Sequence, residues 1–275
     1  MSTFTQDDAA RLLIPQDLLA RAASLHLALH MHSKSVSVAI FEMDPGPALW
    51  QQEFAIDAIH QDPYADAIVF LKKTNWNEKV FRKSTISFDG ENFTLVPSGF
   101  VIAGKEKELL QFNTQLECEF VESQSLEELG ATVISEVPAA IHGMLSQYPN
   151  ARILPVVTLL LKYIQLKKNL LQDQLHIYVQ PNYLLVVAVA KGEMKLTNHF
   201  GIQGNDDVLY HLANACIRLG IDLQNAHIHL YGGAVSAELI TLVKEYALQV
   251  EAWKGTTDKD SEVISFAIEV HTLCA

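Results

Sequence analysis

The stretch from residue 226 to residue 246, AHIHLYGGAVSAELITLVKEY, constrains the fold of this chain more than any other segment. Its apolar side chains first alternate, as in a short strand, and then recur at helical spacing. Gly232 and Gly233 stand between the two patterns. Glycine at a strand end permits a positive φ and lets the backbone come close to another group. The segment therefore predicts a strand, a tight glycine turn and an amphipathic helix in direct succession.

Composition limits the class of protein and the class of partner. The chain has 275 residues, enough for two domains of ordinary size, and 49% of them are hydrophobic, which supports a substantial core. Its formal net charge of −12 repels nucleic acid and anionic lipid. The N-terminal residues lack the pattern of a signal peptide, and the apolar runs are too short to cross a bilayer. We therefore expect a cytoplasmic protein that binds no nucleic acid and does not insert into membranes.

Cysteine usage agrees with a cytoplasmic location. The three cysteines, Cys118, Cys216 and Cys274, lie far apart and have no metal-ligand spacing. An odd and sparse set of this kind is typical of reduced thiols. Cys216 falls in the apolar pattern of a helix, so we expect it to be buried.

The first half of the chain predicts a β-meander followed by mixed elements. After a polar arm with a small helix, alternating apolar residues predict three antiparallel strands with one buried face, at 25–31, 36–40 and 49–56. A helix is expected at 63–71. The dipeptide Asp89-Gly90 is a strong turn signal and predicts a hairpin between strands at 79–87 and 92–96. The remaining short elements are helices at 104–112 and 138–147, a turn of helix at 125–130 and strands at 117–122 and 132–137.

The second half predicts a meander again, after a mostly apolar helix at 155–171. Its strands are expected at 174–179, 183–190 and 194–200. An amphipathic helix capped by Asn205, the strand–glycine–helix element, a strand at 249–253 and a closing helix at 261–274 follow. Because the meander occurs twice, the sequence predicts an α/β protein with mixed sheets and two domains. The first, 1–150, contains the N-terminal meander and a hairpin insertion, and the second, 151–275, includes the closing helix.

This order of elements resembles the actin-like ATPase superfold, a ribonuclease-H-like architecture that also includes sugar kinases and the seventy-kilodalton chaperones. HMHSKSVSVAIFE is similar to its first-phosphate hairpin, and LHIYVQPNYLLVVAVAKGEMKLTNHFGIQGNDDVLYHL to its second-phosphate segment with the following loop and helix. AHIHLYGG resembles the adenosine segment, and DSEVISFAIEVHTLCA the closing helix that returns to the first domain. The phrase FTLVPSGF, with the preceding ISFDGEN, also resembles an uncharacterised bacterial family of degenerate actin-like proteins.

The resemblance implies that both phosphate hairpins have lost the residues that hold phosphate. In the first hairpin, His30 stands at the position of the family's Asp and His32 at that of its Gly, and only Ser33 keeps a hydroxyl. The second turn reads YVQPNY, in which Pro181 removes a backbone donor and Tyr183 adds bulk. Mg²⁺ prefers carboxylate and water oxygens, and neither turn supplies a carboxylate. We therefore expect no catalytic residue, no metal site and no resident cofactor, with Mg·ATP as the nucleotide to be tested.

Four glycines remain as candidate cofactor-binding residues: Gly232, Gly233, Gly201 and Gly204. The first two match the adenosine segment, and the last two match the family's glycine loop before its helix. Each pair also has a structural explanation. The first fits a tight strand-to-helix turn. The second precedes a helix N-terminus, where Asp206 and Asp207 would oppose an anion and favour self-capping.

Two sets of histidines at alternating strand positions are the remaining candidate ligands. His26, His30 and His32 share one face of the first strand, and His227 and His229 repeat the spacing. Alternate residues of a strand lie about 6.6–7 Å apart, so they converge on Zn²⁺ only if the strand curves. A polar, partly exposed sheet face is the alternative that we favour.

These observations predict a catalytically inactive actin-like protein that binds another protein or associates with itself. The alternative is an ATP-dependent small-molecule kinase or ATPase with a rearranged phosphate site. It would use the glycine pair for the base and the loop 201–204 for phosphate. Its acids would come from Glu42, Asp44 or Asp206, which lie outside both phosphate turns, so it ranks second. A metal-dependent enzyme built on the histidines is the third class.

Overall fold

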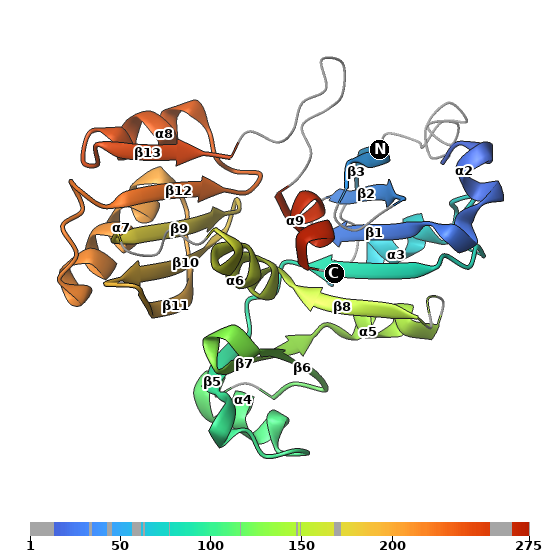
Figure 1. The fold of residues 1–275 in the computed structure, drawn as a ribbon, viewed down its shortest axis with the longest axis horizontal. Coiled ribbons are helices and arrows are strands. Elements are labelled where there is room, and N and C mark those ends of the chain that lie inside the picture. The colour runs from blue at the N-terminus through green and yellow to red at the C-terminus, as the bar shows by residue number, and fades with distance from the viewer. Residues whose placement is uncertain are drawn as a thin grey trace. The chain divides into compact units, whose positions relative to one another are not determined.

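The computed structural model of the chain describes residues 14–32, 35–42, 46–56, 62, 64–76, 78–115, 117–146, 148, 150–167, 172–253 and 266–274. The predicted α/β class is confirmed, with mixed sheets and helices (Figure 1). Contacts divide the chain into two compact units, Met1–Leu160 with Ala267–Ala275 and Leu161–Phe266. Residues 151–160 and most of the closing helix, which the sequence analysis assigned to a second domain, thus group by contacts with the first unit.

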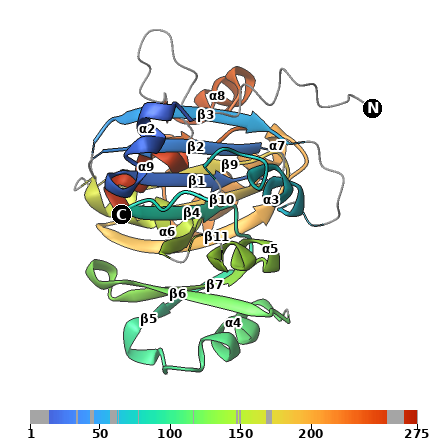
Figure 2. The same cartoon turned by 90° about the vertical axis from the view of Figure 1, so that its right-hand side faces the viewer.

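The first unit is built on a five-stranded sheet. In spatial order its strands are β3 (Ala48–Ala55), β2 (Ser35–Phe41), β1 (His26–Met31), β4 (Lys83–Phe88) and β8 (Ala151–Pro155). The first three form the predicted antiparallel meander. The strand β4 lies beside β1 (Figure 2) and runs parallel to it, and β8 runs parallel to β4. Leu27, Leu29 and Met31 of β1 point into the main core, as their alternation requires.

Short helices cover the apolar face of this sheet. They are α2 (Gln16–Ala20), η1 (Ala22–Ser24), α3 (Ala65–Leu71), α5 (Ala139–Gly143) and η4 (Met144–Ser146). Leu19, Leu71 and Ile141 from three of them share one hydrophobic cluster with the strands. The opposite face of β1 carries histidines, and α9 (Phe266–Cys274) contributes to its cover through His271.

A small sheet is inserted into the first unit between β4 and β8. Its strands are β5 (Phe93–Pro97), β7 (Ala131–Val137) and β6 (Phe120–Leu126), all antiparallel. The helix α4 (Glu106–Thr114) lies beside this sheet (Figure 2). Its Leu110 shares a small hydrophobic cluster with Ile134 of β7. The 3-10 turns η2 (Ser98–Phe100) and η3 (Glu127–Leu129) complete the insertion.

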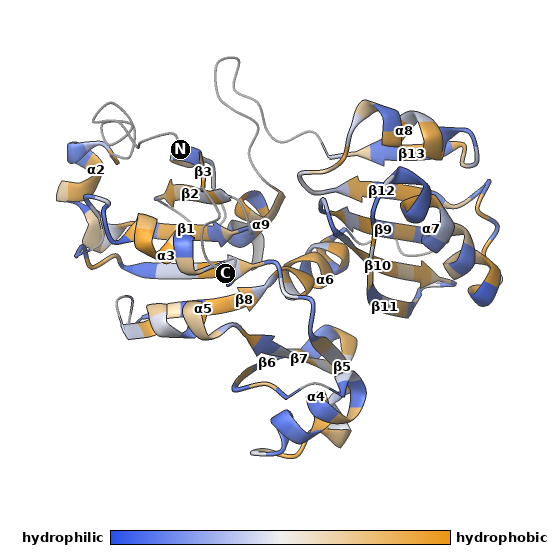
Figure 3. Ribbon diagram, turned by 180° about the vertical axis from the view of Figure 1, so that it is seen from behind, coloured by the Kyte–Doolittle hydropathy of each residue, from blue (hydrophilic) through white to orange (hydrophobic). Residues whose placement is uncertain are grey.

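The second unit repeats the architecture. Its sheet contains β11 (Glu193–Gly201), β10 (Tyr183–Ala190), β9 (Gln174–Val179), β12 (His227–Tyr231) and β13 (Gln249–Ala252), in that order (Figure 1). The helices α7 (Asn205–Leu219) and α8 (Ala237–Lys244) bury Leu212 and Leu239 against one face. The helix α6 (Val156–Leu166) links the two units in sequence, and hydrophobic residues dominate it (Figure 3). Cys216 is buried in α7, as predicted.

Both large sheets follow one strand order. Numbered along the chain within each unit, the strands lie as third, second, first, fourth and fifth, and the first three are antiparallel. The duplicated meander predicted from the sequence is confirmed. The structure adds that each meander continues into two parallel strands.

The predicted hairpin around Asp89-Gly90 is wrong. The strand before it, β4, pairs with β1 and β8, whereas the strand after it, β5, pairs with β7 in the small sheet. Gly90 is explained by close packing, because a Cβ there would lie 2.9 Å from the ring of Phe88. A local turn signal was thus outweighed by long-range strand pairing.

Two boundaries also differ from the prediction. The five-residue strand β8 precedes α6 directly, where the sequence predicted only a turn and a helix. Gly204, not Asn205, occupies the cap position of α7, and Asn205 is the first helical residue. None of the helices that the described residues form has the length and hydropathy needed to cross a bilayer.

Candidate functional site

The histidine face of β1 is buried, which corrects the expectation of a partly exposed face. His26 and His30 are both 0% exposed. The reason is distant in sequence, because α9 covers this face. His271 of α9 places its Nε2 2.6 Å from Ser87 Oγ on β4. The helix thus turns a face that looks amphipathic in the sequence into an interior one.

Parallel pairing with β4 gives each of the two buried histidines a hydroxyl partner. The register sets His30 opposite Ser87. His30 Nδ1 lies 2.6 Å from Ser87 Oγ, and His26 Nε2 lies 2.8 Å from Thr85 Oγ1. The pairing separates His26 from the other two histidines, so the three predicted candidates do not form one site.

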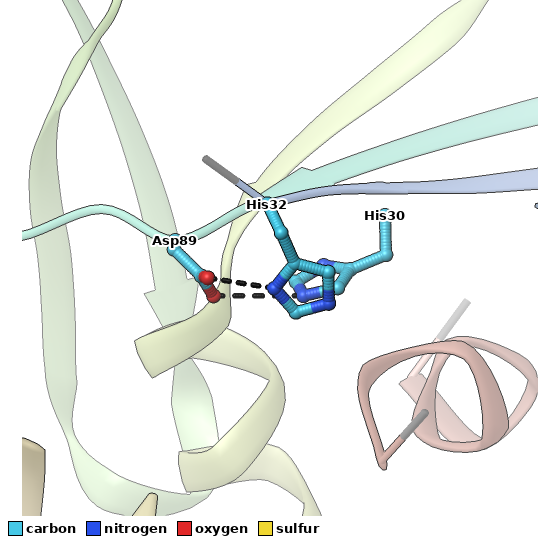
Figure 4. A group of neighbouring side chains, drawn as sticks. All are labelled: His30, His32 and Asp89. Atoms are coloured by element: carbon cyan, nitrogen blue, oxygen red, sulfur yellow. Dashed lines mark hydrogen bonds and ion pairs between the residues drawn. The ribbon is translucent and has the colours of Figure 1, made fainter. Parts of the chain in front are cut away.

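His30, His32 and Asp89 do converge (Figure 4). The imidazole rings have centroids 4.1 Å apart, edge to face. His32 Nδ1 lies 2.8 Å from Asp89 Oδ2, and His30 Nε2 lies 3.5 Å from Asp89 Oδ1. The carboxylate therefore contacts two neighbouring imidazoles at the end of β1, beside the hairpin that resembles the first-phosphate hairpin.

The charges of this cluster follow from burial and mutual contact. Burial and the neighbouring His32 lower the pKa of His30 to about 4, so it is neutral. Burial alone would lower the pKa of His32, but the charges of Asp89 and Glu53 outweigh it and raise that pKa. Burial alone would raise the pKa of Asp89, and His32 with both imidazole contacts holds it well below its usual range. His32 and Asp89 thus form an internal ion pair when His32 is protonated, which its raised pKa favours.

The surroundings of the cluster hold it in place. Tyr64 donates its hydroxyl to the backbone carbonyl of Asp89. Ser87 Oγ contacts both His30 and His271, and a hydroxyl can accept from one imidazole while donating to the other. Ser37 is paired with His30 across the β1–β2 ladder, and its buried Oγ has no hydrogen-bond partner among the described residues.

The second-phosphate turn, in the second unit, is closed by its own contacts. The backbone N–H of Gln180 donates to the carbonyl of Tyr183 at 2.9 Å, and Pro181 has no N–H. Tyr183 is buried. The N–H of Ile202 donates to the carbonyl of Asn182, which ties the loop 201–204 to this turn.

Gly232 is required by packing against this turn. Its φ is +102°, and a Cβ at this position would lie 2.3 Å from the carbonyl oxygen of Val179. The N–H of Ala234 donates to the same oxygen. Gly233 differs, since the nearest atom to its Cβ would be Gln180 Oε1 at 3.7 Å.

The loop glycines have looser surroundings. A Cβ on Gly201 would lie 4.0 Å from the carbonyl oxygen of Asn182, and one on Gly204 would meet nothing within 4 Å. Asp207 Oδ2 accepts from the N–H of Gln203 at 2.7 Å, which satisfies one donor before α7. The turn 180–183 thus has Gly201 on one side and the glycine pair on the other.

Of the acids of the kinase alternative, the structure describes Glu42 and Asp206, and neither is part of a phosphate turn. Glu42 pairs with Arg21 at 2.8 Å and follows Phe41, at the end of β2 remote from the hairpin turn. Asp206 is exposed in the first turn of α7. Asp44 and Ser33 lie outside the described residues.

The second histidine set also gathers beside a carboxylate. His227 Nε2 and His229 Nδ1 lie 3.2 and 3.3 Å from the two carboxylate oxygens of Glu251 on β13. His176 stacks on His229 with centroids 4.6 Å apart. Glu251 is 61% exposed, so this group lies at the surface of its unit.

The residue that sequence reasoning missed is Asp89. The dipeptide Asp89-Gly90 predicts a hairpin turn, so Asp89 is absent from the candidate acids Glu42, Asp44 and Asp206. A signal exists in the alternation Thr85, Ser87, Asp89, which places three polar side chains on one face of a strand. Parallel pairing with His30 in register then brings Asp89 beside His32.

Comparison with solved structures identifies the fold. A Bacteroides thetaiotaomicron VPI-5482 protein with actin-like ATPase fold and unknown function is similar at a TM-score of 0.81 and 18% identity, over 94% of this chain and 98% of that one. The PilM–PilN type IV pilus biogenesis complex contains a chain similar at a TM-score of 0.61 and 13% identity, over 92% and 98%. The predicted actin-like ATPase fold is confirmed by these matches.

Comparison of the sequence itself gives the family. No curated protein matches it. One family model, described as protein of unknown function (DUF3822), matches residues 18–250, which include nearly all of both units. The chain therefore belongs to the DUF3822 family and has the actin-like ATPase fold.

Proposed function

We propose that this protein is a non-catalytic actin-like module of the cytoplasm that works by binding another protein. The observation that carries the proposal is the closed second-phosphate turn. A phosphate hairpin needs backbone N–H groups that can donate to the phosphate. In this turn the N–H of Gln180 donates to the carbonyl of Tyr183, and Pro181 has no N–H. Of the four candidate glycines, Gly232 then has a structural use, because it lets the segment after β12 pack against the backbone of Val179 beside this turn.

The first hairpin supports the same conclusion. Phosphate binding there would have to overcome the charge of Asp89 and the bulk of two imidazoles. The rearranged kinase stays a weaker alternative, because neither Glu42 nor Asp206 lies at a phosphate turn.

Two observations support a protein partner. One of the solved structures of this fold is the PilM–PilN complex, an assembly of two named proteins. In this chain, three large apolar side chains of the inserted region, Phe100, Ile102 and Phe112, are 73%, 65% and 88% exposed. Such side chains are enriched at protein interfaces, and we assign the partner surface to this region.

The inactive half of the proposal is tested by thermal unfolding with Mg·ATP, Mg·ADP and adenosine, together with a phosphate-release assay. A ligand at 100 times its Kd would stabilise the fold by ~2.7 kcal/mol, so binding is readily seen. We expect no shift and no turnover. A shift or turnover that Gly233→Ala removes would contradict it. That variant is chosen because its Cβ has room, unlike that of Gly232.

The binding half is tested with Phe100→Ser/Phe112→Ser against Leu248→Ser, a control of similar exposure in the second unit. Neither change should alter stability by more than about 0.5 kcal/mol, because the side chains are exposed. We expect the double variant alone to lose its partner in quantitative affinity purification. Sedimentation of the pure protein separates a second copy from a different partner. Equal partner recovery by all three proteins would overturn the assignment.

A further inference from the structure

Three potential ligand atoms already converge in the first unit. One ring nitrogen each of His30 and His32 and a carboxylate oxygen of Asp89 lie within 4.8 Å of one another, and Figure 4 shows the three side chains together. Ligands about 2.0–2.1 Å from a tetrahedral metal are separated by about 3.3 Å. The measured separations of 2.8 and 3.5 Å fall on either side of that value. The distances from Asp89 to both imidazoles are thus close to those between ligands of one bound ion.

The contacts around the three residues are those of a supported metal site. Metal-binding histidines normally use one ring nitrogen for the metal and the other for a hydrogen bond. His30 has this arrangement, because Ser87 Oγ lies 2.6 Å from its Nδ1 while Nε2 faces Asp89. Tyr64 fixes the backbone at Asp89. The side chain of His32 is 13% exposed, so the cluster reaches solvent at His32 while His30 is buried.

The ion pair between His32 and Asp89 does not by itself explain the cluster. That pair needs two residues, whereas a third polar ring, His30, is buried edge to face against His32. An ion would take the place of the proton between His32 and Asp89 and would bind His30 as well. Two imidazoles and one carboxylate suit zinc and its neighbours in the first transition row, and they suit magnesium poorly.

We propose that His30, His32 and Asp89 bind one divalent transition-metal ion of the zinc class, with the fourth position left for water or for a group from a partner. The site goes beyond the proposed function and does not depend on it. The surface group of His227, His229 and Glu251 is a second possible metal site in this chain. It is less suited, because its carboxylate is exposed and already spans both imidazoles.

The test is zinc binding by the chelator-stripped full chain, measured by equilibrium dialysis with elemental analysis and by calorimetry. The variants are His32→Asn and Asp89→Asn, with His227→Asn/His229→Asn as the matched control. We expect one tight ion in the wild type and in the control. We expect His32→Asn and Asp89→Asn to bind it at least roughly a hundredfold more weakly, since even outer-shell changes reduce affinity 10- to 100-fold.

Two results would overturn the proposal: no stoichiometric zinc in the wild type, or a tight ion lost only in the His227→Asn/His229→Asn control. Circular dichroism of the metal-free variants shows whether they fold. If His32→Asn and Asp89→Asn unfold the chain, the absorption spectrum of Co²⁺ bound to the His227→Asn/His229→Asn control still tests the proposal. A four-coordinate Co²⁺ spectrum in that protein supports the buried site, and its absence refutes it.

Discussion

Single residues show how much of the chemistry is visible in the sequence. The local sequence pattern identified the glycine pair, but it did not show why Gly232 has to be glycine. Gly232 approaches the backbone of Val179, which lies about fifty positions earlier in the chain. Likewise, the histidines of β1 were found, whereas their burial depends on His271 and their carboxylate on strand pairing. Residue types follow from the sequence, and their partners follow from long-range contacts.

The two adjacent glycines should respond differently to the same substitution. Gly232→Ala adds a Cβ 2.3 Å from a carbonyl oxygen and strains a φ of +102°. We expect a loss of about 3 kcal/mol in the free energy of unfolding. Gly233→Ala has a nearest contact of 3.7 Å and should change it by less than about 0.5 kcal/mol. Urea denaturation measures both, and equal losses would refute the packing explanation.

Acid should weaken the second unit through His229. Burial, with the nearby His227, lowers the pKa of His229 to about 4, whereas an unfolded histidine titrates near 6.5. Between pH 4 and 6.5, His229 is protonated in the unfolded chain but neutral in the folded protein. Its contribution to the free energy of unfolding is therefore fully present above pH 6.5 and decreases as the pH falls toward 4. His229→Gln should remove about 2 to 3 kcal/mol of that fall. Urea denaturation at several pH values tests this, and identical slopes for variant and wild type would contradict it.

Secondary-structure elements were predicted well where a run of apolar residues is bounded by turn residues. The strands β9 and β10 have the bounds that the sequence predicts. The prediction was wrong where a strong dipeptide, Asp89-Gly90, suggested a local turn, because β4 and β5 belong to different sheets. It also missed β8, a strand of five residues that runs directly into a helix. Short strands paired with distant ones leave little local signal.

The N-terminus of α7 gives a prediction at the level of the element. Asp207 accepts the N–H of Gln203, whereas Asp206 at the neighbouring position is exposed. Asp207→Ala should destabilise the protein by about 1 kcal/mol, as the loss of a helix cap does. Asp206→Ala removes a charge from the same turn but not this bond, so it should have a smaller effect. Thermal unfolding compares them, and a larger loss for Asp206→Ala would refute the role of Asp207.

At the scale of the whole molecule, the repeated strand order was the most predictable property. The first meander was predicted from alternation and the second from apolar runs bounded by turn residues, and each belongs to a sheet with the same third–second–first–fourth–fifth order. The boundary between the units was harder to predict. The last helix follows the second unit in sequence but groups with the first by contacts. Membership of a unit is a property of contacts, and a linear pattern does not encode it.

The two units should differ when they are expressed separately. Residues 161–266 form one continuous segment with its own sheet and core, so we expect this fragment to fold alone with a cooperative transition. Residues 1–160 lack α9, whose Ile268 and Val270 are buried. Joining residues 266–274 to 1–160 by a flexible linker should raise its stability by about 2 to 4 kcal/mol. Urea denaturation of the three fragments tests this, and equal stability with and without α9 would contradict it.

The contact between Ser87 and His271 determines when the first unit can finish folding during synthesis. The two residues are 184 positions apart. At about 5–20 residues per second, the ribosome needs roughly 10–40 s to pass from one to the other. During that interval the nascent first unit displays a row of histidines that the finished protein keeps inside. All residues of the second unit are therefore synthesised before the last helix of the first unit is available.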